Sequence, residues 1–306
     1  MDHFANTELT AACRRQTGSN RAFTLTELLV VMAMTALLAT VLLSVAFSTQ
    51  QGAFRAECVS NLRQIGVGMN LYSTEANGYM PICGWANPTS SGNPWQTYQV
   101  CRFSSPGSTN ITLGFENLGL LFRTKVILDP KIFYCPGTSR ISSTFSYDSY
   151  ATAPSGWPST AIGSINAYAR AGYNYYPQLR ATELRNDPNY GSVILPKLTS
   201  TSVQLEFGSA TLVTPAKLTD LDPKKSITTD LVNNYAVLSH QASGSVAGLN
   251  ALFPDGRVAF QTVRNHNTRG SYQPFDPFLW DPTDAGGSGP GNDPTGFRII
   301  MNGWMP

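Results

Sequence analysis

The chain of 306 residues is poor in charge: only 13% of its residues are charged, and its formal net charge is +2. It contains 26 glycines and 20 prolines, and 11% of its residues are aromatic, a balance typical of loop-rich β structure rather than of helical bundles. So small a net charge, without a basic patch that carries interleaved aromatic residues, argues against nucleic acid as a partner.

The first predicted element is an apolar segment with one carboxylate at its start. Residues 21–27 read Arg-Ala-Phe-Thr-Leu-Thr-Glu, and an uncharged, mostly apolar run follows from residue 28 to residue 47. This run is long enough to span a bilayer as a helix. Because a charge near the hydrocarbon is costly unless it finds a partner, Glu27 is a candidate functional residue.

The charges on either side of this run predict its orientation. Arg14, Arg15 and Arg21 precede it, and the first charges after it are Arg55 and Glu57. The positive-inside rule therefore places the N-terminus in the cytoplasm and the residues after about 50 outside.

A secretory signal peptide is the competing interpretation, since Ser44-Val45-Ala46 resembles a cleavage site for one. Two features oppose it. The apolar run is longer than a typical signal core, and an acidic residue between the basic region and that core is out of place in a secretory signal.

Residues 22–27 resemble the class III signal of type IV pilins and of type II secretion pseudopilins, in which a small residue precedes a Phe-Thr-Leu-x-Glu block. The resemblance implies that a prepilin peptidase cleaves between Ala22 and Phe23 on the cytoplasmic side and N-methylates Phe23. It also implies that Glu27 pairs with the N-terminal amine of a neighbouring subunit as helices stack into a filament. The family's residue before the cut is usually glycine, and Ala22 keeps the small size that the peptidase needs.

This resemblance implies a division of the chain into four parts. They are a leader peptide (1–22), the transmembrane half of an N-terminal helix (23–47), the amphipathic exported half of that helix (48–77) and a β-rich globular head (78–306). We expect an α+β fold in which the long helix packs on an antiparallel head with long loops.

From residue 24 to about residue 74 the sequence allows one continuous helix. Its outer half is amphipathic, because apolar residues at a 4-3-4-3 spacing draw one stripe along it. We expect the head to pack on this face. The stripe consists of Cys58, Leu62, Ile65, Met69 and Tyr72.

Glycines and a proline indicate where this helix weakens and ends. Gly52, Gly66 and Gly68 each disfavour helix relative to alanine, so bending or local melting is expected at these positions. The helix is expected to end near Asn77-Gly78, with Pro81 beyond it as a stop.

The head is predicted to consist of short elements between loops. Residues 85–108, rich in Ser, Gly, Pro and Asn, read as a long exposed loop around Cys83 and Cys101. The clearest β signal is a hairpin with strands at 249–253 and 257–261, joined by a Pro-Asp-Gly turn. The other predicted elements are a helix within 118–128 and strands at 132–135, 173–176, 202–207, 235–239 and 297–301, the last of them after a loop at 276–296.

A second resemblance, to one subfamily of pilin-like bacterial proteins, extends from the leader to about residue 260. It rests on residues 58–66, 72–81 and 133–136, and on His240 with Asp255 and Gly256. The subfamily is named for a C-terminal His, nine residues and an Asp-Gly pair, in a domain associated with processing. Here fourteen residues separate His240 from Asp255. The resemblance implies no role for this element.

Four cysteines lie in the exported part, because Cys13 belongs to the leader. An even number in an oxidising compartment favours disulfides over free thiols or a metal site, and spacing alone leaves all three pairings open. The subfamily resemblance implies a Cys58–Cys135 bond, which leaves Cys83 with Cys101. Buried free cysteines are the alternative.

Candidate catalytic and metal residues are few. His240 and His266 are the only exported histidines, with no nucleophile motif or metal-ligand spacing around them, so we expect His240 to be a hydrogen-bonded structural residue. A late Gly-rich loop offers oxygen ligands of the kind that Ca²⁺ prefers, although its spacing matches no defined motif and a solvated turn is favoured. These candidates are Asp281, Asp284, Asn292 and Asp293. We expect no other cofactor.

Together these features predict a non-enzymatic pilin-like subunit of the bacterial inner membrane, with its head in the periplasm or at the cell surface. Its partners would be a prepilin peptidase and other pilin-like subunits, in a type IV pilus or a type II secretion filament. A surface adhesin or substrate-binding module that uses the pilin signal for delivery is the alternative, and an exported hydrolase is a more remote one.

Overall fold

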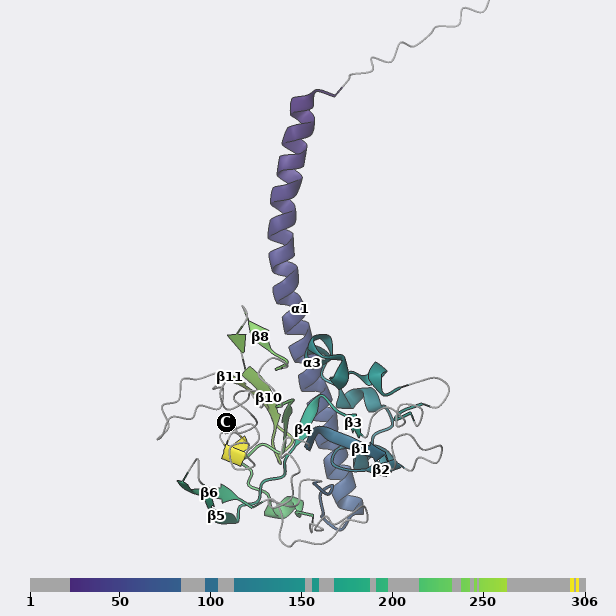
Figure 1. Cartoon of the computed structure of the whole chain (residues 1–306), viewed down its shortest axis with the longest axis vertical. Coiled ribbons are helices and arrows are strands. Elements are labelled where there is room, and N and C mark those ends of the chain that lie inside the picture. Colours follow the sequence, from purple (N-terminus) through teal and green to yellow (C-terminus); the bar gives the residue numbers. More distant parts are fainter. Residues whose placement is uncertain are drawn as a thin grey trace, which may run out of the picture. The chain divides into compact units, whose positions relative to one another are not determined.

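The chain divides into two units, residues 1–49 and residues 50–306. The longest element, the helix α1 (Leu25–Glu75), contributes residues to both (Figure 1). The structure is a computed structural model. It describes residues 23–83, 97–103, 113–151, 156–159, 168–187, 191–197, 215–232, 238–242, 245–246, 248–262, 298–299 and 301–302.

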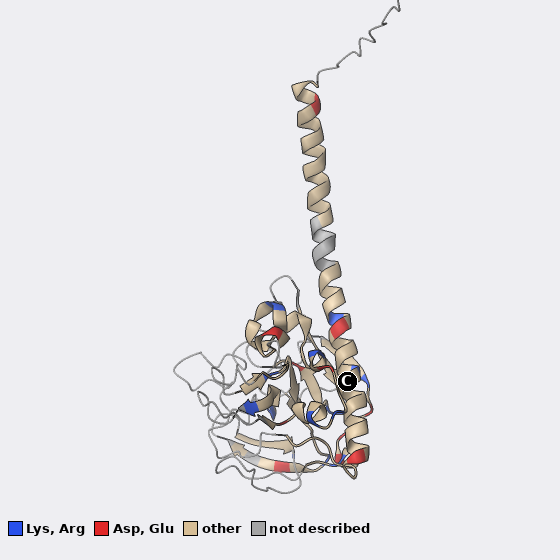
Figure 2. Ribbon diagram, turned by 90° about the vertical axis from the view of Figure 1, so that its right-hand side faces the viewer, with Lys and Arg blue, Asp and Glu red and all other residues tan. Residues whose placement is uncertain are grey.

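In the first unit, the described structure is the beginning of α1. Every described side chain from residue 25 to residue 42 is exposed. Glu27 is the acidic residue in the first turn of this helix, and Figure 2 shows red near the N-terminal end of the helix. By length and composition, Leu25–Leu42 could cross a membrane, and it is the one such helix in the part of the chain that the structure describes. An apolar helix surface that is exposed among the described residues requires lipid or other helices around it.

In the second unit, α1 enters the hydrophobic core along the predicted stripe. Cys58, Leu62 and Ile65 are fully buried, Met69 is 1% exposed and Tyr72 is half-buried. The helical periodicity of the sequence is therefore the periodicity of burial, as predicted.

The expected local melting at glycines does not occur, since α1 is helical through all three. Gly66 and Gly68 instead allow close packing. A Cβ at Gly66 would lie 3.0 Å from Leu252 Cδ1, and one at Gly68 would lie 2.9 Å from Ile127 Cδ1. Tertiary contact thus outweighs the low helix propensity of these two positions. The helix ends as predicted, with Asn77 and Gly78 both at positive φ (53° and 87°).

A four-stranded antiparallel sheet forms the centre of the second unit, in the order β11-β10-β7-β4. Its strands are β4 (Tyr173–Tyr175), β7 (Thr228–Asp230), β10 (Gly248–Leu252) and β11 (Val258–Thr262). All residues of β4, β7 and β10 are buried. The predicted hairpin is β10–β11, with Asp255 Oδ1 accepting from the Arg257 N–H at 3.0 Å and Gly256 at φ 81°.

A second antiparallel sheet, in the order β2-β1-β3, corrects the prediction of a loop around Cys101. Cys101 lies fully buried in β1 (Gln99–Phe103), which pairs with β2 (Leu113–Phe115) and β3 (Tyr168–Arg170). The strand-forming run is only five residues long, and the Ser, Gly and Pro residues around it dominate the composition of that window. The other paired strands are β5 (Thr182–Asp187) with β6 (Gly191–Pro196), and β8 (Gln241–Ala242) with β9 (Ser245–Val246).

Two predicted strands are helical turns. Residues 132–133 belong to the 3-10 helix η2 (Pro130–Phe133), because Pro130 starts the turn and Asp129 Oδ1 accepts from the Lys131 N–H at 3.0 Å. Residues 298–299 and 301–302 are helical as well.

Of the other predictions, the helix within 118–128 is the short α2 (Gly119–Arg123), and the strand at 173–176 is β4. The predicted strand 202–207 lies outside the described residues, and residues 238–239, the described part of 235–239, are not in a strand. The remaining short helices are α3 (Pro136–Ile141), η3 (Ser143–Phe145), η4 (Tyr147–Ser149) and η5 (Leu218–Asp220). The fold is α+β, as predicted.

Candidate functional site

The first candidate site is the start of α1, where Thr24 and Glu27 form a reciprocal cap. The Thr24 N–H and hydroxyl donate to Glu27 Oε2 at 2.9 and 2.8 Å, and the Glu27 N–H donates to Thr24 Oγ1 at 3.2 Å. This arrangement is a capping box, in which the side chains at the N-cap and third helical positions each bind the other's backbone amide. The Glu27 carboxylate therefore has a local partner within its own chain.

This cap leaves the carboxylate accessible. Phe23 and Leu25 beside it are 80% and 78% exposed, as are the apolar residues that follow on the helix. A carboxylate at this end of a helix is stabilised by the helix dipole, and its exposure leaves it accessible to a cationic group of another molecule. Ala22, the residue before the predicted cut, lies outside the described residues.

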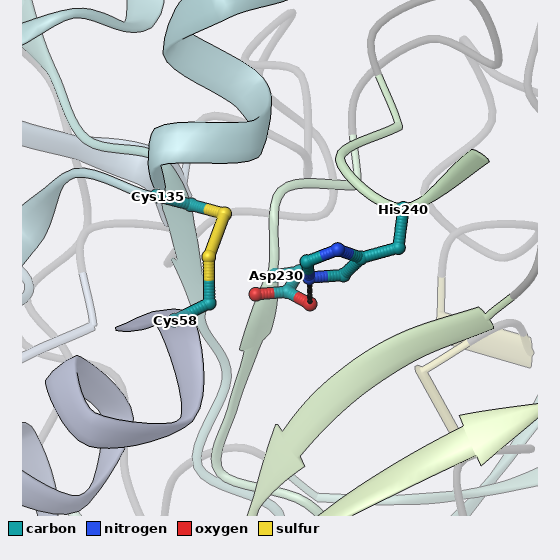
Figure 3. Close-up of side chains that lie close together, drawn as sticks. All are labelled: Cys58, Cys135, Asp230 and His240. Carbon is teal, nitrogen blue, oxygen red and sulfur yellow. Dashed lines mark ion pairs between the residues drawn. A yellow bond between two sulfur atoms is a disulfide. The ribbon is translucent and has the colours of Figure 1, made fainter. Parts of the chain in front are cut away.

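The second candidate site is a buried polar cluster in the core of the head (Figure 3). His240 Nε2 lies 3.1 Å from Asp230 Oδ2, and the two side chains are 4% and 0% exposed. Asn250 completes the cluster, because its backbone N–H and its Nδ2 both donate to Asp230 Oδ2, at 2.6 and 2.9 Å. Asn250 Nδ2 also lies 2.9 Å from His240 Nε2, where the donor depends on the histidine tautomer.

A disulfide between Cys58 of α1 and Cys135 at the N-terminus of α3 borders this cluster. The two sulfurs, a ring nitrogen of His240 and a carboxylate oxygen of Asp230 all lie within 4.8 Å of one another. Figure 3 shows the Asp230 carboxylate between the imidazole and the disulfide. This is the pair that the subfamily resemblance implied.

Close backbone approaches hold the cluster together. A Cβ at Gly172 would lie 2.5 Å from Cys135 N, and one at Gly137 would lie 2.7 Å from the backbone oxygen of Ser239. Real Cβ contacts are essentially never so short, so any larger residue at these two positions would push the disulfide or His240 out of place.

The expected pairing of Cys83 with Cys101 is wrong. Cys83 Sγ donates to the Tyr175 carbonyl at 3.7 Å, and Cys101 Sγ donates to the Arg102 carbonyl at 3.6 Å. Burial raises the pKa of the Cys101 thiol to about 12, so this thiol is unreactive at neutral pH.

His240 and Asp255 have different partners. His240 bonds within the core cluster, whereas Asp255, with a half-exposed side chain, lies 3.4 Å from Arg257 in the β10–β11 turn. The calcium candidates Asp281, Asp284, Asn292 and Asp293 lie outside the described residues.

The comparison with known families concerns the first site. Residues 18–43 match the prokaryotic N-terminal methylation motif. The match supports a type IV pilin-like protein, and with the apolar start of α1 it indicates membrane anchoring. No curated protein and no solved structure matches the chain.

The methylation motif includes the capping box, which our sequence analysis missed. Its signal was present, since Thr-x-x-Glu immediately before an apolar helical run is a recognisable N-terminal pattern. The match ends at residue 43, so it does not include any residue of the buried cluster. Asp230 and Asn250 were also missed by the sequence analysis. No local sequence pattern marks these two residues, because each lies in a short strand and strand pairing, not sequence proximity, brings them beside His240.

A buried carboxyl elsewhere in the head makes stability depend on pH. Burial raises the pKa of Glu116 from 4.5 to about 7, and Arg102 at 3.7 Å offsets this only in part. Between pH 4.5 and about pH 7 the folded state binds more protons than the unfolded state. The free energy of unfolding therefore falls as pH rises through this range. We expect Glu116→Gln to be more stable than the wild type at pH 8 by about 3 kcal/mol and nearly equal to it near pH 4.5. Unfolding midpoints across this range test this, and a constant difference between the two proteins would contradict it.

Proposed function

We propose that this protein is a non-enzymatic, pilin-like subunit of the bacterial inner membrane. A prepilin peptidase would cleave it between Ala22 and Phe23 and methylate the new amine. Residues 23–47 would remain in the membrane, with the N-terminus in the cytoplasm and the head outside. The helices of several subunits would then assemble into a filament, of the type IV pilus or the type II secretion kind.

The observation that carries this proposal is the position of the methylation motif on the helix. The motif covers residues 18–43, and Leu25–Leu42 within it is an exposed apolar helix whose single charge is Glu27. The cap alone does not require that charge, because glutamine at the same position would also complete a capping box. A subunit that stacks against others gains a partner for each newly formed amine, which neutralises two charges that lipid would otherwise leave unpaired.

Analysis of the mature N-terminus tests the processing step. We expect mass spectrometry of the membrane protein to find a chain that begins with N-methylated Phe23. A matched control is Ala22→Gly, which restores the family's usual residue and should give the same N-terminus. A mature chain that begins at Phe47 would identify a secretory signal peptide and refute the proposal.

A further inference from the structure

We propose that Cys58, Cys135, Asp230 and His240 form a zinc site when the two cysteines are reduced. The same four buried side chains would then support two alternative cross-links, a disulfide in the oxidised protein and a bound Zn²⁺ in the reduced one.

The geometry carries this proposal. Structural zinc takes four ligands at about 2.0–2.3 Å, so neighbouring ligand atoms in a tetrahedral site lie about 3.3–3.8 Å apart. The four potential ligand atoms here all lie within 4.8 Å of one another. Small side-chain movements after the sulfur atoms separate would complete the site. The ligands come from α1, the start of α3, β7 and the residue before β8, so the core of the head already brings them together.

The donor set selects the metal. Two thiolates, an imidazole and one carboxylate oxygen suit zinc, whereas Ca²⁺ and Mg²⁺ need oxygen ligands throughout. With zinc bound, the two thiolates and the carboxylate leave a net charge of −1 on the site. The Asn250 amide groups, which already donate to Asp230 Oδ2, would help to stabilise this charge.

The hydrogen bonding of Asp230 is a second, independent observation that supports a metal site. Asp230 is 0% exposed, and its Oδ1 is buried without a hydrogen-bond donor among the described residues. Buried carboxylate oxygens are nearly always satisfied, because leaving one unpaired is costly. Asn250 fixes the carboxylate through Oδ2 and thereby leaves Oδ1 available to a metal, which is how outer-sphere residues orient zinc ligands.

Exchange between the two states needs a two-electron redox partner in each direction. A dithiol reductant supplies two electrons and two protons, which break the Cys58–Cys135 bond and give two thiols, and the reductant becomes a disulfide. Zinc binding displaces the two thiol protons. In the reverse direction, a protein disulfide of the oxidising compartment accepts two electrons from the thiolates and two protons from solvent and becomes a dithiol, while the Cys58–Cys135 bond forms again and Zn²⁺ leaves.

Cobalt binding to the full-length protein in detergent tests the site. After reduction with a phosphine and its removal without air, Co²⁺ is expected to bind at one ion per chain. The expected signals are the thiolate-to-cobalt charge-transfer band and the intense visible bands of tetrahedral cobalt, and added Zn²⁺ should abolish both. The unreduced protein should show neither band.

Two variants separate this cluster from the other thiols. His240→Ala removes a direct ligand, so it is expected to weaken cobalt binding by more than the about tenfold that loss of an outer-shell partner costs. Cys83→Ser, which changes a buried thiol in another part of the core, should leave the bands unchanged. Circular dichroism shows whether each variant folds. If reduction alone unfolds the wild type, added Zn²⁺ should restore its native spectrum. Reduced wild-type protein that binds no cobalt, fails to regain its fold with zinc, or binds cobalt equally well without His240 would overturn the proposal.

Discussion

Replacing Glu27 with glutamine is expected to leave the protein in the membrane and to abolish its assembly. Glutamine at the third helical position still completes a capping box with Thr24, so the start of α1 should be preserved. The apolar run that holds the helix in the bilayer does not change. What disappears is the negative charge that would pair with the Phe23 amine of a neighbouring subunit.

The capping box makes a sharp control possible, because its two halves can be removed separately. Thr24→Ala removes the N-cap hydroxyl and keeps the Glu27 charge, at a usual cost of about 1 kcal/mol in helix stability. We expect Thr24→Ala to assemble and Glu27→Gln to fail, while Glu27→Ala, which loses both the cap and the charge, also fails.

Membrane retention after alkaline extraction and the yield of sheared filaments, read on immunoblots, measure the two outcomes. If the type II secretion alternative applies, export of a substrate replaces filament yield as the measurement. Assembly of Glu27→Gln at the wild-type level would show that the cap, and not charge pairing, explains the residue. The same conclusion would follow if Thr24→Ala failed to assemble while Glu27→Gln assembled.

The parts of the fold that the sequence predicts are those decided by local periodicity. The buried stripe of α1 follows from helical spacing, since Cys58, Leu62 and Ile65 recur on one face. The β10–β11 hairpin follows from the chemistry of its turn, where Asp255 and Gly256 have the backbone roles expected of them. In both cases the residues that determine the structure are neighbours in the chain.

Predictions fail where contacts between residues far apart in the sequence determine the local structure. Gly66 and Gly68 look like weak points of a helix, yet Leu252 and Ile127, far along the chain, use the space that their missing side chains leave. Cys101 lies in a polar, loop-like stretch and is nevertheless in a buried strand, because β2 and β3 pair with it from both sides.

The same distinction separates the two candidate sites. The methylation motif is contiguous, so sequence patterns find Phe23 and Glu27 directly. The buried cluster joins residues up to 182 positions apart, from Cys58 to His240. For His240 alone, a sequence pattern suggested a partner, namely Asp255 of the Asp-Gly pair. The structure gives it Asp230 instead. A partner in a sheet is determined by strand order, which local sequence does not contain.

Removing the Cys58–Cys135 disulfide is expected to be the most destabilising change in the head. The bond joins residues 77 positions apart, and the loop-entropy relation gives about 4 kcal/mol for a cross-link of that span. For a head of this size, that corresponds to a fall in melting temperature of about 10 °C. The variant Cys58→Ser with Cys135→Ser tests this, with tryptophan fluorescence as the signal, since buried Trp157 donates through Nε1 to the Tyr134 hydroxyl at 2.8 Å, next to Cys135.

The measurement belongs in a chelating buffer, so that no metal replaces the missing bond. In this buffer, a reductant should lower the melting temperature of the wild type toward that of the double variant and leave the melting temperature of the variant unchanged. The variant Cys101→Ser controls for the loss of a buried thiol that forms no cross-link. Equal melting temperatures for wild type and double variant would mean that core packing around α1, and not the disulfide, fixes the helix to α3.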